Sequence, residues 1–151
     1  MPSVANVSKD SLGKYKVVCK NQFAYSAIQT GRDECIRIAL YNQDKPCIIS
    51  PAYSVLEVKT KKVLAAYIML WFSRKESDRY GWFISDSSIR ASLELSSFNQ
   101  IKIPLPPLDM QQAIVNIYTV LLERRAINEQ LKQKIKDICP VLVRGAIGEI
   151  Q

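Results

Sequence analysis

Short apolar segments separated by polar turns make up the first two thirds of the chain. Residues 62–77 (KVLAAYIMLWFSRKES) contain no helix breaker and are apolar on nearly every face, which predicts a helix packed deep against a sheet. Together with the strands this helix predicts the α+β fold class, with a small, mostly mixed sheet. Four segments are rich in β-branched residues and bounded by turn residues, as is typical of strands: 15–19, 35–40, 53–58 and 101–105.

A helical pattern follows the prolines at 104, 106 and 107. Asp109, with Gln112 three residues later, fits a capping box at a helix N-terminus. Pro140 predicts the end of the helix, because proline has no amide hydrogen to donate. A helix of about 30 residues measures about 45 Å. We therefore expect a globular domain over 1–107, a long helix over 108–139 and a C-terminal tail over 140–151.

Apolar residues occupy most a and d positions when the long helix is written as heptads. Arg124 and Asn128 interrupt this pattern in the middle, and a buried Asn at an a position fixes the register only when a partner helix is present. The pattern predicts a coiled coil and a homodimer; the alternative is a terminal helix folded back on its own sheet. The predicted interface residues are Ile114, Ile117, Leu121, Arg124, Asn128, Leu131, Ile135 and Ile138.

The net charge of +7 is concentrated in the globular part. Residues 1–108 hold 15 Lys and Arg against 9 Asp and Glu, whereas residues 109–151 hold 6 against 5. A polyanion such as double-stranded DNA suits the first part, and another protein suits the nearly neutral helix. The alternative is a small domain that is basic without a nucleic-acid partner.

Several kinds of chemistry lack the residues that they need. The chain has no histidine and no Cys-x-x-Cys pair, so we expect no histidine-dependent nucleophile, no metal site and no cofactor. The longest apolar run, 63–72, is shorter than the roughly 20 residues of a membrane span, and no leader opens the chain. We expect no membrane partner and a cytoplasmic location.

Asp44, Glu57 and Lys59 imitate the carboxylate and lysine pattern of magnesium-dependent nucleases. Glu57 and Lys59 also fit the end of an alternating strand, where both side chains would face solvent. The nuclease is therefore the least favoured hypothesis, and we expect a protein that is not an enzyme.

Four pieces of sequence, taken in their order, resemble the specificity subunits of type I restriction-modification systems. They contain a Ser-x-Arg, an Ile-x-Ile-Pro-Leu-Pro-Pro-Leu and a Gln-Gln-x-Ile motif. The resemblance runs from about Tyr15 to the end of the chain. The pieces are 20–40 (KNQFAYSAIQTGRDECIRIAL), 48–58 (IISPAYSVLEV), 80–115 (YGWFISDSSIRASLELSSFNQIKIPLPPLDMQQAIV) and the long helix.

The resemblance implies a division of labour between the two parts. In such subunits a target recognition domain reads one half of a split DNA sequence, and a long helix spaces it from a second such domain. The helix also docks methyltransferase subunits, through which restriction subunits join the complex. With one domain and one helix the chain resembles a half subunit, in which a short polar lead-in replaces the front of the recognition domain. Two copies with antiparallel helices would read sites about 13 base pairs apart.

Arginine is the commonest reader of guanine, and Arg90 lies among serines at the Ser-x-Arg position. Residues 23–32 (FAYSAIQTGR) predict a loop suited to bases and phosphates, and the lysines at 59–62 suit phosphates. The alternatives are an Arg90–Asp86 ion pair, an ordinary turn and a solvated lysine run. The predicted DNA contacts are Tyr25, Ser26, Gln29, Thr30, Arg32, Lys59, Lys61, Lys62, Ser87, Ser88 and Arg90.

A second functional class stays open beside DNA recognition. The chain could bind methyltransferase or specificity subunits without reading DNA, as an interaction module or the product of a silent, truncated cassette.

Trp71 and Trp82 are predicted to be core residues rather than stacking platforms, because their neighbours are apolar.

Overall fold

The computed structural model describes residues 9–28, 35–86 and 91–148. The chain divides into two compact units, Met1–Gln112 and Ala113–Gln151. The first unit holds a short 3-10 helix, η1 (Lys9–Lys14), followed by the strands and three short α-helices. The predicted α+β fold class is confirmed.

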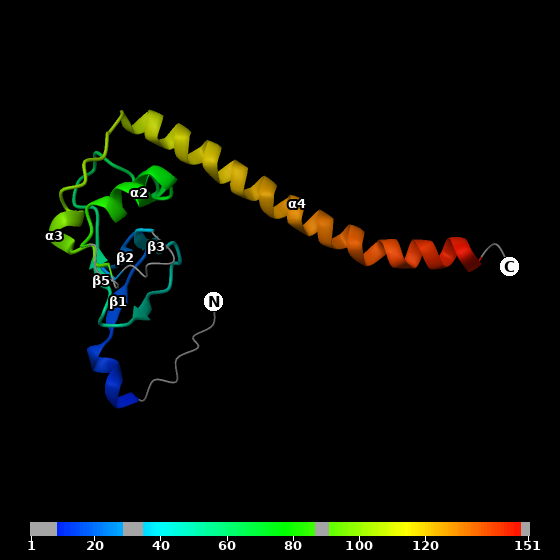
Figure 1. Cartoon of the computed structure of the whole chain (residues 1–151), viewed down its shortest axis with the longest axis horizontal. Helices are drawn as coiled ribbons and strands as arrows, with labels where there is room; N and C mark the ends of the chain where they lie inside the picture. Colours follow the sequence, from blue (N-terminus) through cyan, green and yellow to red (C-terminus); the bar gives the residue numbers. More distant parts are fainter. Residues whose placement is uncertain (1–8, 29–34, 87–90, 149–151) are drawn as a thin grey trace. The chain divides into compact units, whose positions relative to one another are not determined.

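Two small antiparallel sheets form the strand layer of the first unit (Figure 1). β2 lies between β3 and β5, and Phe23 of β2 is opposite Leu40 on one side and Leu56 on the other. β1 pairs with β4. All three pairings in the described residues are antiparallel, so the predicted mixed sheet is wrong. The strands are β1 (Lys16–Val18), β2 (Phe23–Ser26), β3 (Arg37–Leu40), β4 (Cys47–Ile49) and β5 (Ser54–Leu56).

The predicted strands at 15–19, 35–40 and 53–58 correspond to β1, β3 and β5, whereas 101–105 is not a strand. Ile101 and Ile103 pack against the core of the first unit, and Lys102 between them is exposed. The alternation therefore arises from packing without sheet pairing. Pro104 has no amide hydrogen for a sheet ladder.

The single helix predicted over 62–77 is in fact two helices, α1 (Ala65–Phe72) and α2 (Lys75–Phe83). The amide of Ser73 donates to the carbonyl oxygens of Met69 and Leu70 at 3.0 and 3.2 Å, which closes α1. Arg74 then has extended backbone angles (φ −85°, ψ 141°) before α2 begins. α1 contacts both β3 and α2.

Aromatic rings from three elements form the core of the first unit. The rings of Tyr25 in β2 and Phe98 in α3 (Leu95–Phe98) have centroids 4.4 Å apart, and those of Phe72 in α1 and Phe98 are 5.1 Å apart. Leu93 is fully buried beside them. These contacts join the sheet to the helices.

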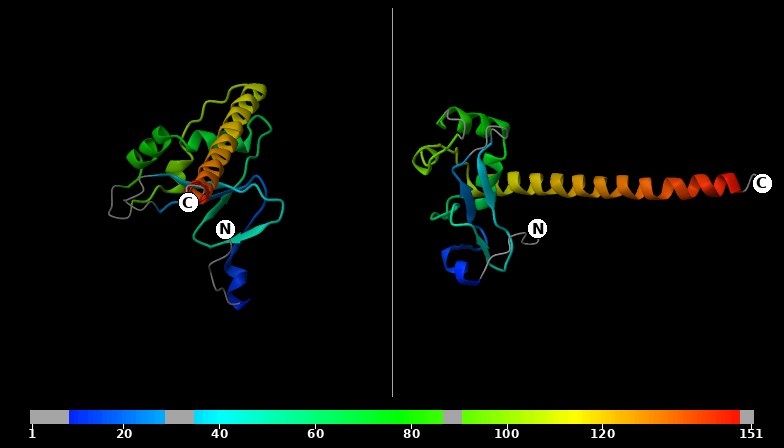
Figure 2. Two further views of the ribbon diagram at one scale, coloured as in Figure 1. Left: turned by 90° about the vertical axis from the view of Figure 1, so that its right-hand side faces the viewer. Right: turned by 60° about the horizontal axis from the view of Figure 1, so that its bottom comes forward.

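The last helix, α4 (Leu108–Gly148), begins at the start of the predicted range and continues past residue 139, where the helix was expected to end (Figure 2). The amide of Gln111 donates to the carbonyl oxygen of Pro107 at 3.0 Å, so Pro107 precedes the first turn. Asp109 lies within that turn, where its charge suits the helix dipole, and the prediction that it is the N-cap is wrong.

Pro140 lies inside α4, and the prediction that it ends the helix is wrong. A proline in a helix removes one hydrogen bond and crowds the preceding turn, at a cost of about 3 kcal/mol. The residues after it within α4 keep their own backbone amides, so the helix continues to Gly148. The predicted tail over 140–151 therefore starts as part of α4.

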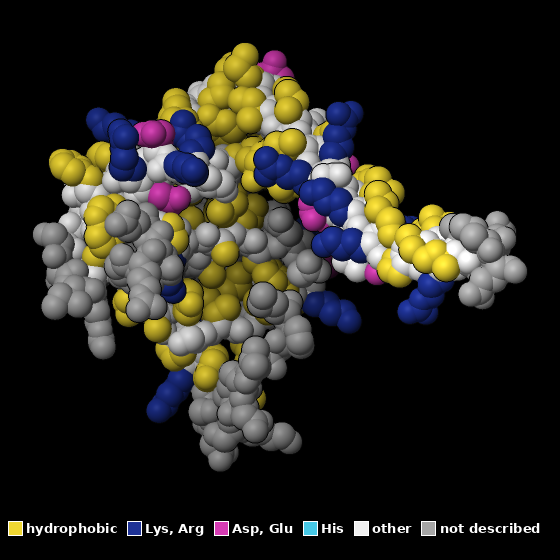
Figure 3. Space-filling model, turned by 45° about the vertical axis from the view of Figure 1, so that its right-hand side comes forward, with side chains coloured by type: hydrophobic (Ala, Val, Ile, Leu, Met, Phe, Trp, Pro, Cys, Tyr) yellow, Lys and Arg dark blue, Asp and Glu magenta, His cyan; other side chains and the backbone are white. Residues whose placement is uncertain are grey.

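The second unit, taken by itself, carries exposed apolar side chains along α4, with basic residues between them (Figure 3). Ile117 is 72% exposed and Ile135 is 61% exposed. We call this set of a and d residues the apolar seam: Ile114, Ile117, Leu121, Leu131, Ile135 and Ile138. Within the described residues, no helix is long and apolar enough to span a membrane.

Candidate nucleic-acid interface

Six of the predicted base and phosphate contacts fall on the segments 29–34 and 87–90. They lie outside the described residues: Gln29, Thr30, Arg32, Ser87, Ser88 and Arg90. The alternative for Arg90, an ion pair with Asp86, also depends on a residue outside the described ranges. The DNA contact and the ion pair therefore both stay predictions.

The described residues that flank these two segments are bonded to one another. Ile28 forms an antiparallel bridge with Ser92, and the amide of Leu93 donates to the carbonyl oxygen of Ala27 at 2.8 Å. The amide of Asp86 donates to the carbonyl oxygen of Ser92 at 3.1 Å, and the Asp86 carboxylate accepts from the Ser92 amide at 2.5 Å. The residue ahead of the first segment is therefore held beside both flanks of the second segment, although residues 35–86 separate the two segments in the sequence.

Tyr25 is a core residue rather than a surface contact, because it lies in β2 and is only 1% exposed. Its hydroxyl donates to the carbonyl oxygen of Leu93 at 2.5 Å. Burial, and after it the charge of Glu94, raises the pKa of Tyr25 to about 12. The prediction that Tyr25 contacts DNA from a loop is therefore wrong. Ser26, the last residue of β2, is half-buried and pairs with Arg37 of β3.

The predicted phosphate contacts Lys59, Lys61 and Lys62 lie between β5 and α1, on residues 57–64, which we call the lysine segment. All three lysines are exposed. No carboxylate of a described residue lies within 4.0 Å of their ammonium groups. The amide of Lys62 donates to the hydroxyl of Thr60 at 3.2 Å, which makes a local turn. The three ammonium groups are therefore open to solvent.

A hollow of about 730 Å³ lies beside the lysine segment. Its floor is apolar and includes Val55, Phe98 and Ile103, while Lys59 and Thr60 stand among its polar lining residues. An apolar floor is unsuited to a phosphate, so a phosphate held by these lysines would lie on the segment itself rather than in the hollow.

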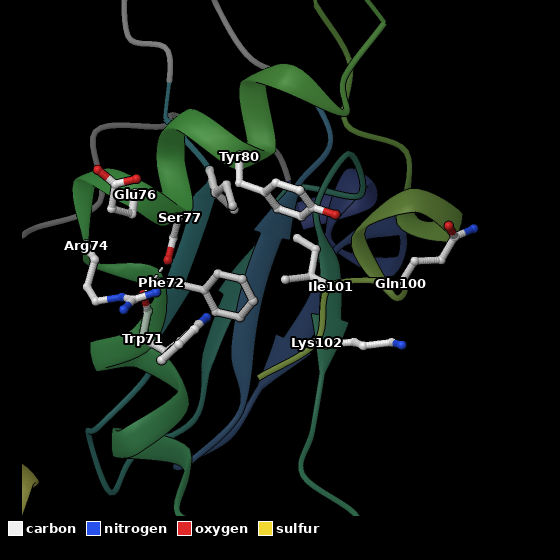
Figure 4. Close-up of a pocket in the computed structure, with 10 residues that line it drawn as sticks. Trp71, Phe72, Arg74, Glu76, Ser77, Tyr80, Gln100, Ile101 and Lys102 are labelled. Carbon is white, nitrogen blue, oxygen red and sulfur yellow. Dashed lines mark hydrogen bonds between the residues drawn. The ribbon is translucent and has the colours of Figure 1, made fainter. Parts of the chain in front are cut away.

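A second hollow, of about 470 Å³, is lined in part by an arginine, Arg74, that the sequence analysis did not select (Figure 4). The guanidinium carbon of Arg74 lies 3.5 Å from the centroid of the Trp71 ring, and its Nε donates to the carbonyl oxygen of Trp71 at 3.3 Å. Stacking on tryptophan holds an arginine in place while its outer nitrogens stay available. The signal was the spacing of three residues between Trp71 and Arg74. Trp71 and Trp82 are half-buried.

The carboxylates of the nuclease hypothesis are occupied by other partners. Asp44 forms an ion pair with Lys20 at 2.6 Å, and Glu57 accepts from the Gln22 side chain at 3.3 Å. In the ranges that the structure describes, no three His, Cys, Asp or Glu side chains gather as metal ligands would. The hypothesis gains no geometric support.

Gln111 is a further residue that the sequence analysis did not select. It is 0% exposed, although glutamine is ordinarily a surface residue. Its Oε1 accepts from the amide of Leu64 at 3.0 Å, and its Nε2 donates to the carbonyl oxygens of Lys62 at 3.0 Å and Pro106 at 2.7 Å. The signal was the first glutamine of the Gln-Gln-x-Ile motif, directly after the prolines.

Comparison with known proteins places these features in a family context. The family model described as "Type I restriction modification DNA specificity domain" matches residues 3–137, which begins ahead of Tyr15, where the motifs put the start. The specificity subunit of the type I restriction enzyme HindI from Haemophilus influenzae is 24% identical over 145 residues. That alignment covers 94% of this chain and 31% of the relative, so the chain spans about a third of its length.

Proposed function

This chain belongs to the family of type I restriction-modification DNA specificity domains, and from that premise we propose that it reads one half of a split DNA target. The observation that carries the proposal is the bonding of Ile28 and Ala27 to Ser92 and Leu93. It joins the attachment points of the two segments on which Arg32 and Arg90 lie. Arginine is the commonest reader of guanine in a major groove, and segments attached side by side would bring Arg32 and Arg90 to adjacent bases.

The lysine segment supplies the sequence-independent part of binding in this proposal. Exposed ammonium groups release counterions from DNA phosphates and fix the position of the protein without reading bases. Arg74, stacked on Trp71, is a further candidate for a phosphate contact. The protein recognises DNA and leaves catalysis to its partners.

α4 is the assembly element in this proposal. The apolar seam is exposed on the second unit by itself, and two copies of the chain would cover it by pairing their helices. A helix of 41 residues measures about 62 Å, which corresponds to about 18 base pairs and replaces the shorter spacing expected from residues 108–139. Methyltransferase subunits dock on the paired helices and bring restriction subunits with them.

The test is to produce the chain together with the methyltransferase subunit of a type I restriction-modification system, and to map the methylated bases by sequencing. The proposal predicts methylation at a split, palindromic target that disappears when the chain is omitted. Methylated sites that are the same with and without the chain would contradict it.

Subunit binding without DNA recognition is the second candidate function, and the exposed apolar seam is the observation that favours it. It predicts co-purification with the methyltransferase subunit and no preference of the chain for any duplex DNA sequence. Sequence-specific binding of the purified chain to DNA would exclude this candidate.

A further inference from the structure

The buried Gln111 side chain bonds to the end of the lysine segment as a neighbouring strand would. Its amide oxygen accepts from the Leu64 amide, and its amide nitrogen donates to the Lys62 carbonyl oxygen, so both backbone groups around Val63 are satisfied by one side chain. Only glutamine and asparagine side chains carry the amide donor and acceptor of a peptide group. The shorter asparagine would lack the reach that these distances of 3.0 Å require.

The same side chain is fixed from its other side. Its Nε2 also donates to the Pro106 carbonyl oxygen at 2.7 Å, and its backbone amide donates to the Pro107 carbonyl oxygen at 3.0 Å. Nearby, the hydroxyl of Tyr67 donates to the Pro104 carbonyl oxygen at 3.0 Å. Gln111 therefore connects the lysine segment to the proline segment and to the first turn of α4, all within the first unit.

We propose that Gln111 is a positioning residue for phosphate binding, which holds the lysine segment in the conformation that meets DNA. This inference rests on the proposed function, because it assigns Lys59, Lys61 and Lys62 to phosphates. A segment fixed before binding loses little conformational freedom on DNA, whereas a released segment must be ordered at that moment. The fixed and the released segment carry the same three lysines for contact with phosphates.

This role has a signature that loss of a lysine does not share. Ordering even one released residue lowers affinity by about fivefold to thirtyfold. The number of phosphates neutralised stays the same, so the slope of log affinity against log salt is unchanged. Removal of one phosphate-contacting lysine, in contrast, reduces the slope by about 0.9.

The experiment measures the binding of labelled random-sequence duplex DNA to the full chain by fluorescence anisotropy over a series of salt concentrations. Gln111→Met keeps the length of the side chain and removes its three hydrogen bonds; Gln43→Met is the control, because Gln43 is exposed in the same unit. We expect about tenfold weaker binding with an unchanged slope for Gln111→Met. Lys61→Ala should show the reduced slope, and the control should bind as the unaltered chain does.

Hydrogen exchange on the unaltered chain keeps the test decisive if Gln111→Met fails to fold. The Leu64 amide should exchange as slowly as the Leu93 amide, which is bonded to the Ala27 carbonyl oxygen. Exchange of Leu64 at the rate of an exposed loop would overturn the inference, as would a folded Gln111→Met that binds DNA normally. If the unaltered chain shows no salt-dependent DNA binding while Leu64 is protected, the proposed function itself fails.

Discussion

Substitution of Tyr25 by Phe separates its role in the core from its predicted role as a DNA contact. The change removes the hydroxyl that donates to the Leu93 carbonyl oxygen and keeps the ring that packs on Phe98. Tyr25 is 1% exposed, so no water replaces the lost donor without rearrangement. At pH 8 we expect the free energy of unfolding to fall by about 1.5 kcal/mol.

The stability difference between the unaltered chain and Tyr25→Phe should decrease as the pH rises. The pKa of Tyr25 is raised from 10.0 in the unfolded chain to about 12 in the folded protein, chiefly by burial. The folded state thus favours the neutral phenol. The contribution of the neutral Tyr25 side chain to the free energy of unfolding is complete below pH 10 and is lost as the pH rises through 12. Between pH 10 and pH 11 the unaltered chain should lose about 1 kcal/mol that Tyr25→Phe does not lose. The stability gap between the two proteins should close near pH 11.

Urea unfolding followed by tryptophan fluorescence measures these quantities, because Trp71 and Trp82 both belong to the first unit. Binding of random-sequence duplex DNA at pH 8 should be the same for both proteins. A stability gap that stays constant up to pH 11 would refute the burial of the hydroxyl. A loss of DNA affinity without a loss of stability would restore Tyr25 as a DNA contact.

Three further substitutions test other parts of the account. Gly81→Ala should lower the free energy of unfolding by about 1–3 kcal/mol in the same urea titration, because an added Cβ would lie 2.5 Å from the Cγ1 of Ile36; an unchanged midpoint would show that Ile36 moves aside freely. Ile135→Asp places a charge in the apolar seam and should convert a dimer to a monomer in sedimentation at tens of micromolar, whereas a monomeric unaltered chain would contradict the pairing. Arg90→Ala should weaken binding to the cognate sequence by about 1–3 kcal/mol and leave binding to random-sequence DNA almost unchanged. Equal losses of affinity for both DNAs would show that Arg90 does not contact bases.

Strands were predictable where β-branched residues marked them, and not where the pattern was short or had another cause. β1, β3 and β5 followed from such runs, but β2 alternates over only four residues and was taken for part of a loop. The alternation of 101–105 is as regular, yet it reflects two isoleucines packed against the core with no strand beside them. Alternation predicts which side chains are buried, whereas sheet pairing depends on a partner that the local sequence does not contain.

The ends of α4 show a similar limit. A proline predicts a helix end from local backbone chemistry, but at Pro140 the helix continues to Gly148. Gln111 was hidden for a related reason: its importance comes from Lys62 and Leu64, almost 50 residues earlier, which only the fold brings near. The lysine segment and the two arginine-bearing segments were selected from the sequence, and their contacts with DNA stay predictions. The bonding of Ile28 to Ser92 that joins the latter could not be predicted from either segment alone.

The most direct measurement incubates a library of random duplex DNA with the purified chain and sequences the molecules that stay bound. The account predicts an enriched motif of a few base pairs, which dimeric protein retains as two inverted copies at one fixed spacing. It also predicts that Arg90→Ala loses this motif while still retaining DNA at low salt. Retained DNA without any enriched motif, or no retained DNA at all, would contradict the claim that this chain recognises a DNA sequence.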